Sequence, residues 1–406
     1  MNKTLLALTV SLLLAAQGCS EATTVSSAPE TTAESSAAVM PQSASEQYLA
    51  MVDNFFNDQL KLEPIYATFV GVNDYNDQFG GALTEEYLKA RHDLNSHYFS
   101  QAKTIDVDKL PASLKLSYDM FIYDRNMELI GETYPEYFLP INQFYSTVFT
   151  MVQLGSGESA QPFKTVEDYQ NWLGRLRGFI NWTKLAQQRM DEGIASKVVL
   201  PRVLVERIIP QLDAQLVTDA QSSFFYSPIN LLPESFTAEQ KAQLTKEYSQ
   251  LIDSELLPAL TQLRDYVKNV YLPSSRASDG WWGLPNGKDW YQHLANSHTT
   301  TTLSVDEIHQ IGLSEVARIL SEMDKVREQV GFKGDLTAFF ASLSSESQYF
   351  FTDRQDLIDG YMAIKDHINQ VLPQYFNVMP KADYIVKPVE SFREKSAAGA
   401  SYESPA

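Results

Sequence analysis

Long stretches in which apolar residues recur every three or four positions constrain this chain most strongly. The clearest stretch runs from Thr165 to Gly193 and keeps this spacing through Thr183. Such a period places the apolar side chains on one face of an α-helix. Thr165 is a residue type that caps helix starts, and Gly193 is one that favours helix ends. The sequence therefore predicts an amphipathic helix over residues 165–193.

Four further stretches open with a capping box, in which Ser or Thr is followed three residues later by Glu or Gln. The boxes are Ser43 with Glu46, Thr237 with Gln240, Ser304 with Glu307 and Thr352 with Gln355. Their helices are expected to reach about Leu60, Tyr271, Gly331 and Leu372. The fold class is therefore mainly α, with one large multi-helix domain. The best strand signal is residues 384–389, where Pro388 limits a strand to the edge of a sheet.

Residues 276–302 have a different composition, rich in Gly, Pro and aromatic side chains, and are expected to form a structured loop region. Four aromatic residues here are candidates for lining a ligand cleft: Trp281, Trp282, Trp290 and Tyr291. Such side chains can equally fill a core beneath a long loop. The sequence leaves both interpretations open.

The amino terminus has the pattern of an export signal. A short positive start is followed by an apolar run over residues 4–16, which is shorter than the roughly 20 residues a spanning helix needs. Small residues then precede Cys19, the single cysteine of the chain, and this resembles the lipobox of bacterial lipoproteins. The resemblance implies that the lipid bilayer is a partner through an acylated Cys19. Because Ser20 is not the aspartate associated with inner-membrane retention, we expect a position on the outer membrane, facing the periplasm.

The expected organisation has three parts. Residues 1–18 form a signal peptide, residues 19–45 form a lipidated cysteine and a disordered tether rich in Ser, Thr and Ala, and residues 46–406 form the helical domain. The tether contains too few apolar residues to offset its chain entropy.

Composition and motifs exclude several functions. The net charge of −19 repels polyphosphates, so nucleic acid is not an expected partner. No histidine is followed by glutamate, so the usual zinc-protease helix is absent from the sequence, and neither a phosphate loop nor a nucleophile elbow is present. The pairs His92/His97 and His293/His298 are spaced by five, which turns them about 140° apart on a helix. The sequence therefore predicts no catalytic residue, no metal ligand and no cofactor in this chain.

Ordered blocks along the chain resemble the bacterial family catalogued as domain of unknown function 885. The blocks are residues 64–68 with Gly71 and Asp74, residues 169–177 with Gly193, residues 200–202, 258–259 and 271–273 with Arg276, residues 284–287 with Tyr291, residues 299–300 and residues 307–319. The last block is the most specific. Together they cover about residues 46–406.

This resemblance implies a fold similar to the helical part of gluzincin-type metallopeptidases, with zinc held by a His-Glu-x-x-Pro-Gly-His helix that is absent from this sequence. We therefore expect the amino-terminal portion of a zinc-dependent peptidase or hydrolase, truncated at its carboxyl end and inactive alone, with peptides as substrate. The alternatives are an envelope lipoprotein that binds peptides or a partner without catalysis, or a nonfunctional remnant. A truncated domain should expose an apolar patch larger than a few hundred square ångströms. The oligomeric state is not indicated.

Overall fold

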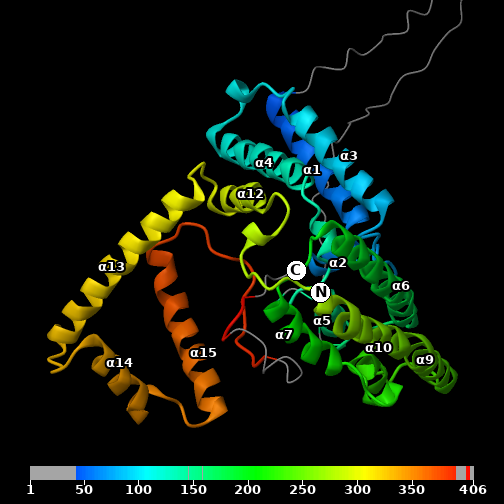
Figure 1. Ribbon diagram of the computed structural model, residues 1–406. Helices are drawn as coiled ribbons and strands as arrows, with labels where there is room; N and C mark the ends of the chain where they lie inside the picture. The colour runs from blue at the N-terminus through cyan, green and yellow to red at the C-terminus, as the bar shows by residue number, and fades with distance from the viewer. Residues whose placement is uncertain (1–42, 145, 158, 390–398, 403–406) are drawn as a thin grey trace, which may run out of the picture. The chain divides into compact units, whose positions relative to one another are not determined.

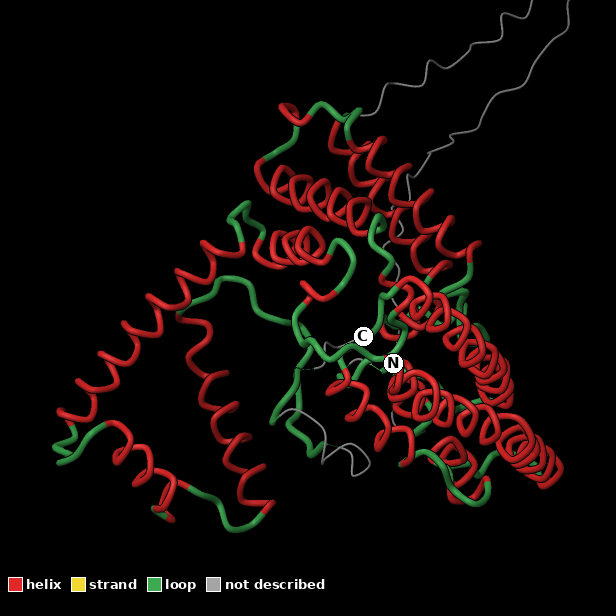
Figure 2. The backbone as a smooth tube through the Cα atoms, in the orientation of Figure 1, coloured by secondary structure: helices red, strands yellow, loops and turns green. Residues whose placement is uncertain are grey.

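The computed structural model describes residues 43–144, 146–157, 159–389 and 399–402. The predicted signal peptide, Cys19 and almost all of the predicted tether lie outside these residues. Helices account for the regular structure of the described part, in which no strand is drawn (Figure 2). The mainly α prediction is confirmed.

The helices follow one another with mostly short connections (Figure 1). Their bounds are α1 Ala44–Leu62, α2 Pro64–Phe69, α3 Glu85–Ala102, α4 Ala112–Gly131, α5 Thr147–Leu154, α6 Val166–Ser196, α7 Arg202–Asp213, α8 Ser227–Asn230, α9 Ala238–Leu251, the π-helix η5 Ile252–Leu256, α10 Leu257–Tyr266, the π-helix η6 Val267–Tyr271, α11 Leu272–Ser274, α12 Gly287–Thr299, α13 Val305–Gln329, α14 Leu336–Ser345 and α15 Arg354–Val371.

Most predicted helix starts are confirmed. Ser43, Thr237 and Ser304 each accept a hydrogen bond from the backbone of the third helical residue and complete a capping box. Thr165 does the same at the start of α6. At α15 the prediction is wrong by one residue, because Asp353 rather than Thr352 caps the helix through the backbone N–H of Gln355. Aspartate is at least as good a cap as threonine.

The predicted end of the longest helix is wrong. Helix α6 continues to Ser196, and the left-handed residue that ends it is Lys197. Gly193 serves close packing instead, since a Cβ atom there would lie 2.6 Å from the carbonyl oxygen of Val198. Glycine signals in sequence do not distinguish a helix end from a tight contact.

Two other local predictions need correction. Residues 384–389 form no strand, because no neighbouring chain in the described residues offers a ladder and Pro388 lacks an N–H group. The expected loop region of residues 276–302 contains α12, which begins after the left-handed Asn286. Trp290 and Leu294 lie one turn apart on this helix and pack in the same small cluster, which favours the helix over a loop.

The main core surrounds α6. Its inward side chains, including Trp172, Leu176 and Phe179, are fully buried and contact residues from α5, α7, α9 and α10. Helices α9, η5, α10, η6 and α11 form one continuous helical segment. The part of this segment from α9 to η6 packs along α6. A separate cluster joins α1, α3 and α4, where Phe55 meets Tyr98 and Phe121 edge to face.

Arg175 of α6 is completely buried. It holds α2 and the loop that follows α2 against the core. Its guanidinium donates to the carbonyl oxygens of Pro64, Tyr75 and Gln78 and to the side chains of Thr68 and Gln161, over 2.6–3.2 Å. No carboxylate of the described residues forms an ion pair with it. Burial lowers the pKa of Arg175 to about 10, so it remains a cation at neutral pH. Neutral acceptors therefore compensate its desolvation.

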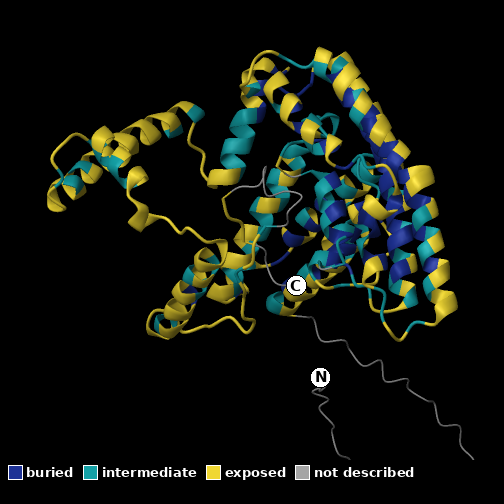
Figure 3. Cartoon of the chain, turned by 90° about the horizontal axis from the view of Figure 1, so that it is seen from below, coloured by how far each residue is buried: buried dark blue, intermediate teal, exposed yellow. Residues whose placement is uncertain are grey.

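Residues 299–389 contrast with this core. Only Lys365 is buried among them, although α13 and α15 carry apolar stripes as regular as that of α6. Figure 3 shows this contrast between a part rich in buried residues and a part that is almost wholly exposed or intermediate. Exposed apolar side chains are therefore numerous on these helices, and the contiguous patch expected for a truncated domain stays a prediction.

We predict that Arg175→Met lowers the free energy of unfolding by roughly 3–5 kcal/mol, because five acceptors would lose their buried partner. The matched control is Arg202→Met, because Arg202 is half exposed and its ion pair with Glu206, at 3.6 Å, is long and exposed to solvent. This control should change stability by no more than about 0.5 kcal/mol. Urea unfolding of both variants measures the difference, and equal losses would contradict the role given to Arg175.

We also predict opposite effects of alanine at two helical glycines. Gly178→Ala should destabilise by about 1–3 kcal/mol, because the new Cβ would lie 2.5 Å from the Cβ atom of Phe79. Gly312→Ala should stabilise α13 by up to about 1 kcal/mol, because nothing lies within 4 Å of the new atom and alanine favours helix. Urea unfolding and hydrogen exchange in α13 measure the two effects. Stabilisation by Gly178→Ala would refute the close packing described.

Candidate functional site

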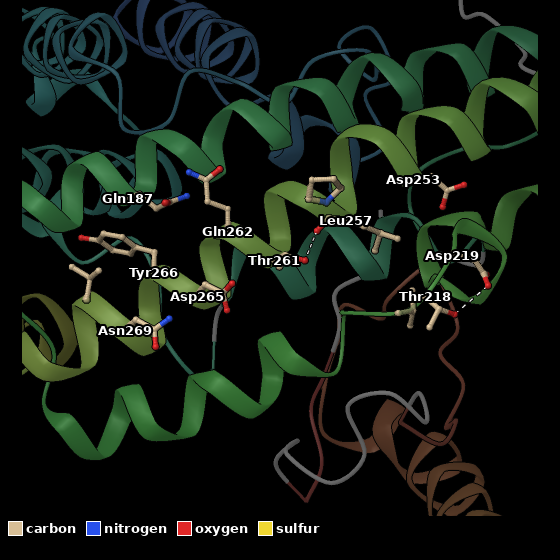
Figure 4. A pocket seen from close by; sticks show the side chains of 13 residues that line it. Gln187, Thr218, Asp219, Asp253, Leu257, Thr261, Gln262, Asp265, Tyr266 and Asn269 are labelled. Carbon is tan, nitrogen blue, oxygen red and sulfur yellow. Dashed lines mark hydrogen bonds between the residues drawn. The ribbon is translucent and has the colours of Figure 1, made fainter.

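An open groove of about 1000 Å³ lies beside α10 (Figure 4). It lies between α6, the loop after α7 and the continuous helix from η5 to η6. Its carboxylate and amide side chains are Gln187, Asp219, Asp253, Gln262, Asp265 and Asn269. Figure 4 shows Asp219 and Asp253 at one end and Asn269 towards the other.

Two π-helical turns shape the wall of this groove. In each, the residue before a proline donates its N–H to a carbonyl five residues back, Leu257 to Ile252 and Leu272 to Val267. Pro258 and Pro273 lack the N–H that a regular α-helical turn requires, and the wider turn accommodates the ring. The π-turns place Asp253 and Asn269 in the groove. Such turns often occur at functional sites.

The carboxylates of the groove are partly committed to local structure. Asp253 accepts a hydrogen bond of 2.6 Å from the backbone N–H of Ala220 and so fixes the loop after α7. Asp219 accepts hydrogen bonds from Ser222, which lower its pKa and keep it ionised at neutral pH. Asp265 accepts from Arg264 at 2.7 Å. The remaining oxygens leave the groove with a negative potential.

Tyr266 marks the other wall of the groove. Its hydroxyl donates to Asp191 at 2.6 Å, and burial together with this carboxylate raises its pKa far above the ordinary value. The phenol therefore stays protonated and is not a base. Because the lining contains no lysine, arginine, histidine or cysteine, the groove offers acceptors and negative charge rather than a nucleophile and its base. The arrangement is suited to binding a cationic or amide-rich ligand.

The four aromatic residues singled out in the sequence do not share one environment. Trp290 is buried, stacks on Tyr134 with ring centroids 5.4 Å apart and meets Trp281 edge to face. Trp282 is half exposed and lies 4.9 Å from the ring of Tyr291. None of the four lines the groove beside α10. Whether they border a cleft in a complete protein stays a prediction.

His92 and His293 have contacts of different kinds. His92 lies 2.8 Å from Glu132, which also accepts from Asn95. His293 stacks on Tyr134, and its partial burial lowers its pKa, so the ring is neutral at neutral pH. Among the described residues, no group of three or more His, Cys, Asp or Glu side chains could hold a metal ion.

The groove was not predicted from the sequence. Its carboxylates belong to a chain with 51 acidic residues, so nothing in the sequence distinguishes them from a solvated surface. The two Leu-Pro pairs at residues 257–258 and 272–273 were the available signal, since a proline inside a predicted helix implies a local disturbance.

A solved structure that resembles the chain in fold comes from Colwellia psychrerythraea. It is described as "The crystal structure of the putative lipoprotein from Colwellia psychrerythraea" and matches with a TM-score of 0.75 and 20% sequence identity. The match covers 90% of this chain and 66% of that chain, so about one third of the solved protein has no counterpart here. No curated protein matches the sequence. None of the described helices is long and apolar enough to cross a bilayer.

The sequence profile of a bacterial family matches residues 64–406, which is most of the chain and almost all of its described helices. The helical fold of the Colwellia protein agrees with this assignment. The chain therefore belongs to the family described as "Bacterial protein of unknown function (DUF885)".

Proposed function

We propose that this chain is the helical scaffold of a lipid-anchored envelope hydrolase, and that the complete enzyme is a zinc-dependent peptidase whose catalytic residues lie outside the described part. The observation that carries this proposal is the unburied apolar surface of α13 and α15, within a chain that spans only 66% of its solved relative. Exposed apolar helices and partial coverage of a longer relative are both expected of a scaffold that packs against a further part of the complete protein.

The anchor and the chemistry have separate support. The lipobox-like sequence before Cys19 and the description of the Colwellia protein as a lipoprotein support attachment to the cell envelope. The zinc peptidase activity is supported by the resemblance of the sequence blocks to gluzincin-type enzymes. Outer-membrane attachment is proposed from Ser20 after the cysteine.

The described residues do not fit a zinc site, because no suitable group of His, Cys, Asp or Glu side chains comes together in them. The zinc ligands of the proposed enzyme therefore have to come from other residues of the complete protein. We assign no catalytic step to the residues of this chain.

We predict that the recombinant 406-residue protein does not hydrolyse peptides, whereas a form extended by the residues its reading frame encodes after Ala406 does, and that a zinc chelator abolishes this activity. The measurement is release of a fluorophore from a quenched peptide library. Zinc-dependent hydrolysis by the 406-residue protein would refute the scaffold assignment. An extended form that stays inactive with added zinc would refute the peptidase.

A second function, peptide binding without catalysis, is favoured by the groove beside α10. Its lining has three carboxylates and three amides around a space of about 1000 Å³ and no basic side chain, although Arg264, outside the lining, forms an ion pair with Asp265. Cationic peptide segments would pair with the carboxylates, and main-chain amides would pair with Gln187, Gln262 and Asn269.

We predict that a tri-lysine peptide binds this groove and that Asp265→Asn weakens binding about 3- to 5-fold, since one exposed charge pair contributes at most about 1 kcal/mol. The control is Asp356→Asn on α15, which removes the same charge outside the groove lining and should leave the affinity within about twofold. Titration calorimetry at low and high salt measures both variants. Equal weakening by the two substitutions would indicate only general attraction to an acidic protein.

A further inference from the structure

The apolar faces of α13 and α15 form a docking surface that nothing in the described structure covers. We call Val316, Ile319, Leu320, Met323, Val326 and Val330 the α13 stripe. We propose that the α13 stripe, together with a second apolar stripe on α15, is the binding surface for a segment of the complete protein that corresponds to the third of the Colwellia chain without a counterpart here. The inference rests on the part of the proposed function in which the complete protein is longer than this chain. It is independent of zinc and of catalysis.

The α13 stripe has the pattern of a buried helix face without the burial. Its members recur at three- and four-residue spacing, yet their exposed fractions run from 39% to 63%. By contrast, Trp172, Leu176 and Phe179 of α6 are fully buried at the same spacing. Large contiguous apolar surfaces on soluble proteins mark interaction sites.

The second stripe consists of Leu357, Tyr361, Ile364 and Ile368 on α15, at successive turns of one helix face and with exposed fractions of 39–56%. Phe350 and Phe351, just before α15, are exposed by more than half. Helices α13 and α15, which are separated in the chain by α14, thus each present an apolar ridge. Ridges of this kind pack into the grooves of a further helix.

Ion pairs along α13 stabilise the helix locally, and Arg327 lies on the same helix face as the α13 stripe. Arg318 pairs with Glu315 and Glu322, and Arg327 pairs with Asp324, all along the helix itself. On the face opposite the α13 stripe lie small or charged side chains such as Ser321 and Lys325. The ion pairs leave the residues of the α13 stripe available to a partner.

The size and charge of the surface favour a segment of the same protein as its occupant. The solved relative has the same fold and about one third more chain, which is enough for several helices. The chain has a net charge of −19, which disfavours an anionic membrane surface as the occupant. A covalently attached segment also binds to the two stripes without the entropy cost of bringing in a second molecule.

The experiment compares the labelling rate of single engineered cysteines in two forms of the protein. Met323→Cys places a thiol in the α13 stripe, and Ser321→Cys places a matched thiol on the opposite face of the same helix. Each is made in the 406-residue protein and in the form extended by the residues encoded in frame after Ala406. Maleimide labelling is followed by mass spectrometry of peptides, which separates the engineered thiol from Cys19, and circular dichroism checks the helix content of each variant.

We expect the extended form to slow labelling at Met323→Cys by about tenfold or more, with Ser321→Cys equally fast in both forms. Equal rates at Met323→Cys in the two forms would overturn the proposal, as would a reading frame that stops after Ala406. The labelling rate of Met323→Cys in the 406-residue protein could also be low and fall further as the protein concentration rises. That result would identify a second copy of the chain as the occupant and would also overturn the proposal. If the extended form protects Met323→Cys from labelling but lacks peptidase activity, the docking surface is supported and only the proposed peptidase activity is refuted.

Discussion

The burial of one cation, Arg175, is the constraint on which the rest of the ordered core depends. Its guanidinium satisfies three backbone carbonyls and two side chains from residues 64–78 and 161, all without an ionic partner in the described residues. This network fixes α2 and its following loop onto α6, and it allows Gly174 and Gly178 to receive that loop at van der Waals contact. With one side of α6 held in this way, its other faces pack against α9 and α10, and the groove forms beside them. No other side chain can donate to these five acceptors in the same positions. Arg175 therefore specifies one arrangement of α2, its following loop and α6.

Helices α6 and α13 show that amphipathic pattern and burial are different properties. Both begin with a complete capping box and both carry apolar residues at helical spacing. The stripe of α6 is buried because several helices from distant parts of the sequence reach it, whereas α13 makes few contacts beyond its neighbours in the chain. Local hydrogen bonds and ion pairs explain why α13 is helical, but they do not explain why its face is apolar. The docking surface proposed for α13 and α15 gives that face a role.

Much of the fold could be predicted from the sequence because the signals were local. The caps at Ser43, Thr165, Thr237 and Ser304 depend on residues three positions apart, and the structure contains all four. The failures depended on contacts between distant residues. Gly193 proved to be a packing position that also faces Phe138, and residues 384–389 lacked a strand to pair with. The groove could not be predicted because its carboxylates are three among 51 acidic residues and are brought together only by the folded chain and its two π-turns.

The central claim is that the chain combines a self-sufficient core around α6 with helices α13 to α15 that lack tertiary support until another segment covers them. Native-state hydrogen exchange on the 406-residue protein tests this most directly. The account predicts that amides in the middle of α6 exchange only through global unfolding, while those of α13 and α15 exchange at least about a hundredfold faster through local opening. Protection of α13 equal to that of α6, independent of protein concentration, would contradict the account, because it would mean that this chain already buries the α13 stripe.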